Sequence, residues 1–252
     1  MARPDCKLIT IPISHFCEKA RWALDRAGIE FEERAHLQVL HWIPARLAGG
    51  GTTVPVLVCG KTVLKESADI LAWADAHAPA DLRLYPDDPE QAAAVGALER
   101  DFDERLGPQG RLWLYDNLRG KRALVRKYAA TGVPTWQRLG LPIAYGPVAK
   151  ILDRHFKITP ESAAQAIADV RDTFDEVAER LADGRPYLMG DRFSAADLTF
   201  SALSAPVLSP PGYGVPLPEP DELPPAMGAV TRELREHTAG RHALRMFREE
   251  RR

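Results

Sequence analysis

Cysteine and net charge are both scarce in this sequence. Its 252 residues include three cysteines, and 33 Lys and Arg stand against 35 Asp and Glu, which gives a formal net charge of −2. The cysteines, Cys6, Cys17 and Cys59, predict neither a disulfide framework nor a zinc site. The balanced charge gives no electrostatic case for a nucleic acid or an anionic membrane as a partner. The seven histidines are scattered without metal-ligand spacing, so no metal is expected.

Long apolar runs are also absent. No stretch is apolar enough over the length needed to cross a bilayer, and the first residues lack the pattern of a signal peptide, so we expect a cytoplasmic protein. A chain of this length can form two small domains. Residues 78–90 contain three prolines and several acidic residues, which is typical of a linker. We therefore predict domains over 1–78 and 91–252, joined by a linker over 79–90.

The most informative stretch begins as a strand and changes abruptly to helical periodicity. Residues 7–13 are rich in isoleucine and leucine, which favours a strand, and apolar residues then recur at helical spacing. Gly28 is expected to close this helix as its C-cap, because glycine is common at helix ends. Ser14 stands at the predicted N-cap of this helix. Its hydroxyl and the free N–H groups of the first turn would together favour an anion.

The same helix carries two further signals. Glu18, Lys19 and Arg21 fall on the face of the helix opposite the apolar residues. Ser14 and Cys17 have the spacing of a C-x-x-C redox motif whose first cysteine is replaced by serine. Such a serine cannot form a disulfide, but its hydroxyl can donate to a thiolate that a ligand brings. A plain N-cap without a ligand is the simpler alternative.

The following residues complete an α/β pattern. A second strand over 29–36 predicts a parallel βαβ unit with the first strand and helix. Residues 37–51 predict a short helical turn and a loop, and strands over 53–58 and 62–64 predict a hairpin. A helix capped by Ser67 is expected next.

Three motifs, in this order, resemble those of the glutathione transferase family. The first is SHFCEKARWAL at 14–24, similar to the active-site helix of bacterial, zeta-like and omega-like members. The second is VPVL at 54–57, which resembles the family's cis-proline strand, and the third is ESADI at 66–70, which resembles its glutathione-binding turn. The resemblance implies an α/β thioredoxin-like N-terminal domain followed by an all-α C-terminal domain, with glutathione as the cosubstrate.

The resemblance also implies roles for individual residues. Ser14 would contact the glutathione sulfur, and the backbone of Val54, next to Pro55, would pair with the cysteinyl part of the tripeptide. Glu66 would face the γ-glutamyl ammonium, and Ser67 would face the γ-glutamyl carboxylate.

Four further residues are candidates for the site. Thr53 stands where many relatives carry a basic residue or glutamine, so His41 is the candidate for the glycyl-carboxylate contact. Cys17 is either a small buried hydrophobe or a reactive thiol. His15 is expected at the pocket rim, and Tyr115 near an apolar second substrate.

The rest of the chain predicts helices with several interruptions. A break is expected at Gly107-Pro108, and residues 132–157, with three prolines, predict short or offset helical pieces. Ser194 and Asp197 predict a capping box with a structural role. Residues 205–225 carry too many prolines for a regular element.

Three functions agree with these observations. The first is a glutathione transferase in which Ser14 stabilises the thiolate that attacks an electrophilic carbon of an apolar alkyl or aryl substrate. The second is a glutathione-dependent thiol reductase that uses Cys17. The third is a transferase-like protein without catalysis that binds ligands or other proteins. The resemblance implies a homodimer in each case.

Overall fold

The computed structural model describes residues 5–251, which form two compact units. The first unit contains the residues up to Arg83 together with Lys121–Ala149, and the second contains Leu84–Gly120 and Lys150–Arg251. Within the described part of the chain, no helix has both the length and the apolar character needed to span a membrane.

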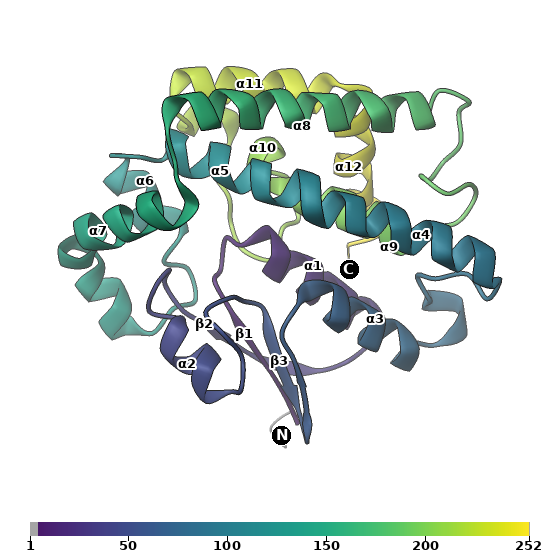
Figure 1. Ribbon diagram of the computed structural model, residues 1–252, viewed down its shortest axis with the longest axis horizontal. Helices are drawn as coiled ribbons and strands as arrows, with labels where there is room; N and C mark the ends of the chain where they lie inside the picture. The colour runs from purple at the N-terminus through teal and green to yellow at the C-terminus, as the bar shows by residue number, and fades with distance from the viewer. Residues whose placement is uncertain (1–4, 252) are drawn as a thin grey trace. The chain divides into compact units, whose positions relative to one another are not determined.

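The first unit is built on a mixed four-stranded sheet with the order β2-β1-β3-β4 (Figure 1). β1 (Cys6–Thr10) pairs in parallel with β2 (Phe31–Ala35) and antiparallel with β3 (Val56–Cys59), and β4 (Thr62–Leu64) pairs antiparallel with β3. α1 (His15–Arg26) connects the parallel pair, as the βαβ pattern predicts. The predicted thioredoxin-like α/β arrangement is confirmed.

Helices cover both faces of this sheet because side chains alternate along each strand. Ile9 of β1 packs against Ala45 of α2 (Trp42–Leu47) on one face. Leu8 points to the other face, where it is fully buried and where α1 packs with α3 (Ser67–His77).

The prediction about the cysteines is wrong. Cys6 and Cys59 lie directly opposite each other in the β1–β3 pair and form a disulfide. The strand register brings these two residues together although they are 53 positions apart. The spacing of the cysteines in the sequence does not predict that register. Cys17 is the free cysteine of the described chain.

α6 (Arg122–Tyr128) and the first part of α7 (Thr135–Phe156) group with the sheet in the first unit, although they lie within the range 91–252 for which a helical C-terminal domain is expected. Leu37, in the loop after β2, packs with Leu141 of α7. The side-chain oxygen of Gln137 accepts a hydrogen bond from the Leu37 N–H at 2.8 Å. These contacts between residues about a hundred positions apart attach α7 to the loop that follows β2.

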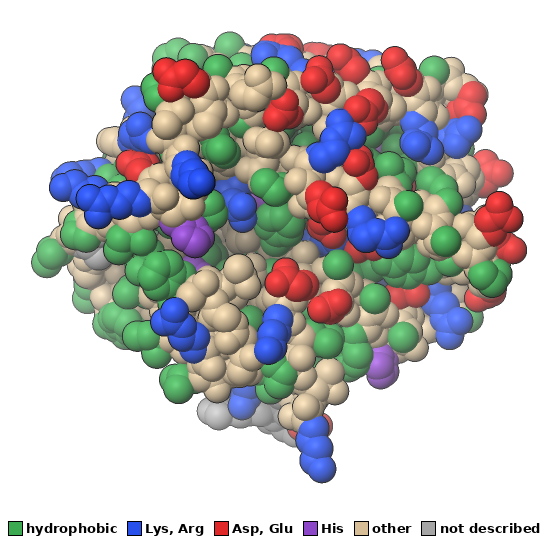
Figure 2. Space-filling view, viewed as in Figure 1, with side chains coloured by type: hydrophobic (Ala, Val, Ile, Leu, Met, Phe, Trp, Pro, Cys, Tyr) green, Lys and Arg blue, Asp and Glu red, His purple; other side chains and the backbone are tan. Residues whose placement is uncertain are grey.

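α7 also differs from the predicted short, offset pieces, because it is one helix that continues through Pro142 and Pro147. Each proline removes a single backbone donor, and the remaining hydrogen bonds hold the helix together. Trp136, Leu139 and Ile143 of this helix are exposed to solvent. Figure 2 shows hydrophobic side chains at the surface over α7 and α2, in the lower left of the view.

The second unit is helical, as predicted. α4 (Pro89–Asp101) leads through the π-helical turn η2 (Phe102–Leu106) into α5 (Gly107–Asn117), and α8 (Pro160–Arg180) packs along α5. The break expected at Gly107-Pro108 is therefore a local widening of the helix just before these residues.

The chain ends with four helices, α9 (Ala195–Leu203), α10 (Ala205–Leu208), α11 (Pro225–Glu236) and α12 (Thr238–Glu249). α10 lies inside the stretch that was expected to be irregular throughout, because its single proline falls in the first helical turn, where no N–H is needed. Two short 3-10 turns, η1 and η3, span Ala80–Leu82 and Pro220–Glu222.

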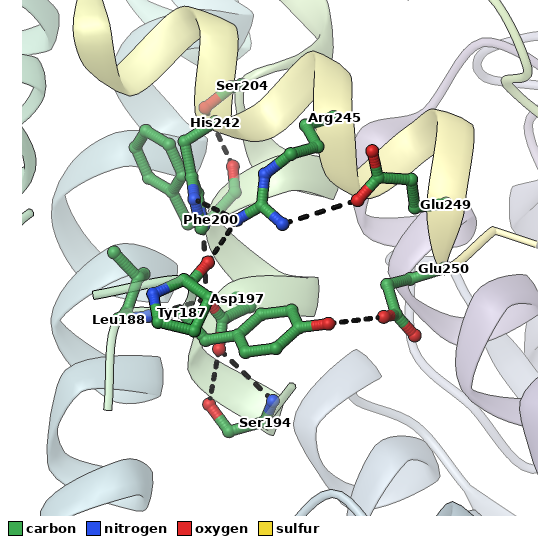
Figure 3. A network of polar contacts seen from close by, with 11 residues as sticks. Tyr187, Leu188, Ser194, Asp197, Phe200, Ser204, His242, Arg245, Glu249 and Glu250 are labelled. Carbon is green, nitrogen blue, oxygen red and sulfur yellow. Dashed lines mark hydrogen bonds and ion pairs between the residues drawn. The ribbon is translucent and has the colours of Figure 1, made fainter. Parts of the chain in front are cut away.

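Asp197 is the centre of a buried polar network in the second unit (Figure 3). Its Oδ2 accepts hydrogen bonds from the N–H and the hydroxyl of Ser194, at 3.1 and 2.7 Å. Its Oδ1 accepts from the Leu188 N–H at 2.8 Å and lies 3.1 Å from His242 Nε2 on α12. The predicted capping box is confirmed, and its role is structural because the carboxylate joins α9 to two other segments.

Candidate functional site

Strand register places three candidate segments at one end of the sheet. Ile9 pairs with Val56, so the end of β1 and the start of β3 are adjacent, and Leu57 pairs with Leu64 at the end of β4. The turn into α1, the loop before β3 and the turn into α3 therefore lie at the same end. These segments hold five of the candidate residues: Ser14, Val54, Pro55, Glu66 and Ser67.

Ser14 caps α1, as predicted. Its backbone is extended, and its Oγ accepts a hydrogen bond from the Cys17 N–H at 3.4 Å. Its own N–H donates to the Ile11 carbonyl at 3.0 Å, which closes the turn after β1. The side chain is half-buried. A hydroxyl at this position can donate its hydrogen to an anion that the positive end of the helix also attracts.

A buried arginine holds the turn that leads to Ser14. Arg21 donates to the Pro12 carbonyl, to Glu18 Oε2 and to Glu33 Oε1, each at 2.9 Å. The Arg21 side chain is 3% exposed, and that of Glu18 is 0% exposed. A charge at this depth is tolerated because the guanidinium is fully engaged by two carboxylates and a carbonyl.

The charged face of α1 is buried as well as its apolar face. Glu18, Lys19 and Arg21 are all buried. Helical periodicity identifies two faces but does not show that both are covered, and here β2 supplies Glu33 on the charged side. The available signal was the opposite charge of Glu18 and Arg21 at a spacing of three residues.

Cys17 is fully buried, and burial raises the pKa of its thiol from 9.0 to about 11. The nearby Arg21 guanidinium and the hydrogen bond with Ser14 lower this pKa, but they offset only part of the cost of burial. The thiol is therefore protonated at neutral pH. Such a cysteine is a poor nucleophile because thiolate is the reactive form.

The Val54–Pro55 peptide bond is cis, as the resemblance implies. Pro55 is buried and Val54 is half-buried. Pairing of β3 with β1 starts at Val56, so the N–H and C=O of Val54 lie outside the ladder. An extended peptide can form strand-like hydrogen bonds with such a backbone.

α3 begins at Ser67, with Glu66 as its N-cap, one residue earlier than predicted. The first helical bond runs from the Ile70 N–H to the Glu66 carbonyl at 3.0 Å. The N–H groups of the three residues between them have no acceptor within the helix. They suit a carboxylate, and the exposed Glu66 side chain offers a negative charge beside it.

His41 is buried at the start of α2, with 6% of its surface exposed. Its Nε2 donates to the Thr52 carbonyl at 2.9 Å, and its Nδ1 has no hydrogen-bond partner among the described residues. Burial lowers the pKa of His41 below its usual 6.5, so the ring is neutral at pH 7. This geometry favours a role in holding the loop before Pro55 over a charged contact with a carboxylate.

The two remaining candidates are His15 and Tyr115. His15 is the first residue of α1, directly after Ser14; it is buried, and its ring lies 4.6 Å from that of Phe16. Tyr115 belongs to the second unit, where its ring lies 5.4 Å from the ring of Phe156. Across the described residues, no three His, Cys, Asp or Glu side chains are grouped to hold a metal.

Comparison with known families gives two matches. A model of the glutathione S-transferase N-terminal domain matches residues 8–82, and a model of the glutathione S-transferase C-terminal domain matches residues 160–203. No curated protein sequence matches the chain significantly.

Solved structures of glutathione transferases have the same fold at low sequence identity. One is a theta class enzyme from Xanthomonas axonopodis pv. citri with glutathione bound, at 19% identity and a TM-score of 0.55 over 96% of this chain and 97% of that one. A glutathione S-transferase from Xanthobacter autotrophicus is 17% identical, with a TM-score of 0.58 over 97% of this chain and 93% of that one. Glutathione transferase F2 from Populus trichocarpa is 14% identical, with a TM-score of 0.56 over 96% of this chain and 99% of that one.

Proposed function

Because this chain belongs to the glutathione S-transferase family, we propose that it catalyses the attack of a glutathione thiolate on an electrophilic carbon of an apolar alkyl or aryl substrate. The observation that carries the proposal is the position of Ser14. It caps α1 at the end of the sheet that also holds the cis Val54–Pro55 bond and the N-terminus of α3.

Glutathione would bind along these three segments. The N–H and C=O of Val54 would pair with the cysteinyl residue in the manner of an added strand. The free N–H groups at the start of α3, including that of Ser67, would bind the γ-glutamyl carboxylate, and Glu66 would attract the γ-glutamyl ammonium. Support comes from the backbone of Val54, which starts outside the sheet ladder, and from the exposed position of Glu66.

Ser14 would lower the pKa of the bound thiol. Its hydroxyl would donate a hydrogen bond to the thiolate, and the N-terminus of α1 would add favourable electrostatic potential. The thiol proton would leave to solvent, the sulfur would form a C–S bond with the electrophile, and the leaving group would depart with its electron pair. The protein would thus contribute positioning and charge stabilisation, while the nucleophile comes from glutathione.

The transferase is favoured over a reductase because of Cys17. A reductase would need an accessible thiolate at this position, whereas the thiol is fully buried with a pKa raised to about 11. Cys17→Ala is accordingly expected to keep the activity. We also propose a cytoplasmic homodimer, and light scattering of the purified protein tests the dimer.

The test is conjugation of glutathione to 1-chloro-2,4-dinitrobenzene and to alkyl halides, followed for the native protein and for Ser14→Ala. Loss of one transition-state donor lowers kcat by roughly 10²-fold. Thr159→Ala is the matched control, because it removes an N-cap hydroxyl from α8 and leaves the proposed site unchanged. Equal activity of native protein and Ser14→Ala would contradict the role of Ser14, and no conjugation of any electrophile would favour a non-catalytic protein.

A further inference from the structure

Positive charge is segregated within the first unit. Residues 36–65 and 121–149 together contain eight Lys and Arg and no Asp or Glu, although the whole chain has a net charge of −2. The two segments pack together through Leu37 and Leu141. The balanced total therefore conceals two segments that carry positive charge alone.

Large apolar side chains are exposed on the same two segments. Trp136, Leu139 and Ile143 of α7 are 66, 71 and 86% exposed, and Ile43 and Leu47 of α2 are 66 and 84% exposed. Within each helix the spacings of three, four or seven residues put these side chains on one side. We call these five residues the α2–α7 surface. Exposed apolar residues that gather in this way usually mark a contact with another body.

A pocket of about 260 Å³ lies between α6 and α7. Its lining includes Arg122 and Arg126, one helical turn apart, together with Leu141, Pro142 and Tyr145. The Arg122 guanidinium lies 5.3 Å from the centre of the Tyr145 ring. No acidic residue lines this pocket, and no carboxylate in the described chain pairs with either arginine. Two such arginines suit a phosphate group, and the apolar wall suits the chain attached to it.

We propose that the α2–α7 surface docks on an anionic membrane. The apolar side chains would enter the boundary between headgroups and acyl chains, while Arg122 and Arg126 would face the lipid phosphates. The protein would lie on the membrane without crossing it.

Two other occupants fit the same observations less well. A second copy of the chain docked on this surface would bring Arg122 and Arg126 of one molecule towards those of the other, which is repulsive. RNA would suit the charge, but four of the five residues of this surface are aliphatic, and Trp136 alone offers an aromatic face on which a base can stack. A membrane uses both the charge and the aliphatic side chains.

The test is sedimentation of the full chain with phosphatidylcholine vesicles and with vesicles that contain phosphatidylserine as well. Binding to the anionic vesicles alone, weakened by salt, is expected. Trp136→Ser/Leu139→Ser/Ile143→Ser should lower the partition coefficient at least tenfold, and Arg122→Gln/Arg126→Gln about fivefold for each charge removed. The control Arg100→Gln/Arg180→Gln removes two exposed charges from the second unit and should bind like the native protein.

Circular dichroism of each variant checks that it is folded, which is expected because the substituted side chains are exposed. The proposal is overturned if the native protein does not bind anionic vesicles at low ionic strength, or if the folded triple-serine variant binds them as well as the native protein does. It is also overturned if the triple-serine change lowers the oligomeric mass without affecting vesicle binding, or if the native protein binds RNA and not vesicles.

Discussion

The Arg21 guanidinium donates from Nη2 to the carbonyl oxygen of Pro12 at 2.9 Å. Pro12 lies in the turn between β1 and Ser14, so a residue two helical turns into α1 fixes the path by which the chain reaches its own N-cap. The same guanidinium binds Glu18 and Glu33. The direction of the Ser14 hydroxyl therefore depends on a charge network that does not itself touch the proposed ligand.

Arg21→Met should destabilise the protein by about 3 to 5 kcal/mol, because it removes the buried guanidinium that pairs with the buried carboxylate of Glu18. Arg21→Lys should be milder, since lysine keeps the charge but cannot reach three acceptors at once. Urea unfolding measures both effects. The matched control is Arg34→Met, which breaks an exposed pair with Glu32 and should cost less than about 1 kcal/mol. Equal losses for the two methionine variants would contradict the structural role of Arg21.

Cys17 should make stability fall in alkaline solution. Its thiol has a pKa raised from 9.0 to about 11 by burial, so the folded state keeps a proton that the unfolded state releases above pH 9. The stabilisation is fully present below pH 9 and is lost as the pH rises towards 11, with a slope of about 1.4 kcal/mol per pH unit.

The measurement is the free energy of unfolding of native protein and of Cys17→Ala at a series of pH values from 8 to 11. The difference between the two proteins isolates this thiol from the lysines and tyrosines that titrate in the same range. Iodoacetamide should leave the folded native protein unmodified at neutral pH. Rapid alkylation of Cys17 under those conditions would show that the thiol is accessible, and would favour the thiol-reductase function over the transferase.

His41 should make the stability of the protein fall in acidic solution. Burial holds its pKa below the usual 6.5, so the unfolded state takes up a proton more readily than the folded state does. Its contribution to stability is present above pH 6.5 and is lost as the pH falls through that range. His41→Gln should weaken this decline between pH 7 and 5 relative to the native protein. An identical decline in both proteins would mean that His41 is not the group responsible.

Local sequence signals predicted the parts of the site that depend on backbone geometry. Ser14 at an N-cap and Gly28 at the end of the helix each follow from the preference of one residue type for one conformation, whereas the N-cap of α3 is Glu66 and not the expected Ser67. Gly28 indeed has a φ of +70°, which favours glycine. The cis bond before Pro55 came from the family resemblance, since the residue composition favours trans.

The features that the sequence did not reveal depend on contacts between distant residues. The burial of Arg21 depends on Glu33 of another strand, and the Cys6–Cys59 disulfide depends on the register of β1 and β3. The attachment of α7 to the first unit depends on Gln137 reaching Leu37. Neither periodicity nor composition predicts these contacts, because they form only when the sheet and helices are assembled.

The most direct test of the account is an ultraviolet titration of the glutathione thiol in the presence of the protein. With native protein, the thiolate signal should appear at a pH at least about one unit below that of free glutathione, which corresponds to roughly 1.4 kcal/mol of thiolate stabilisation. With Ser14→Ala, glutathione should still bind, but the signal should return close to the pH found for the free thiol. An unshifted titration with native protein, or the same shift in both proteins, would contradict the claim that Ser14 activates the thiol.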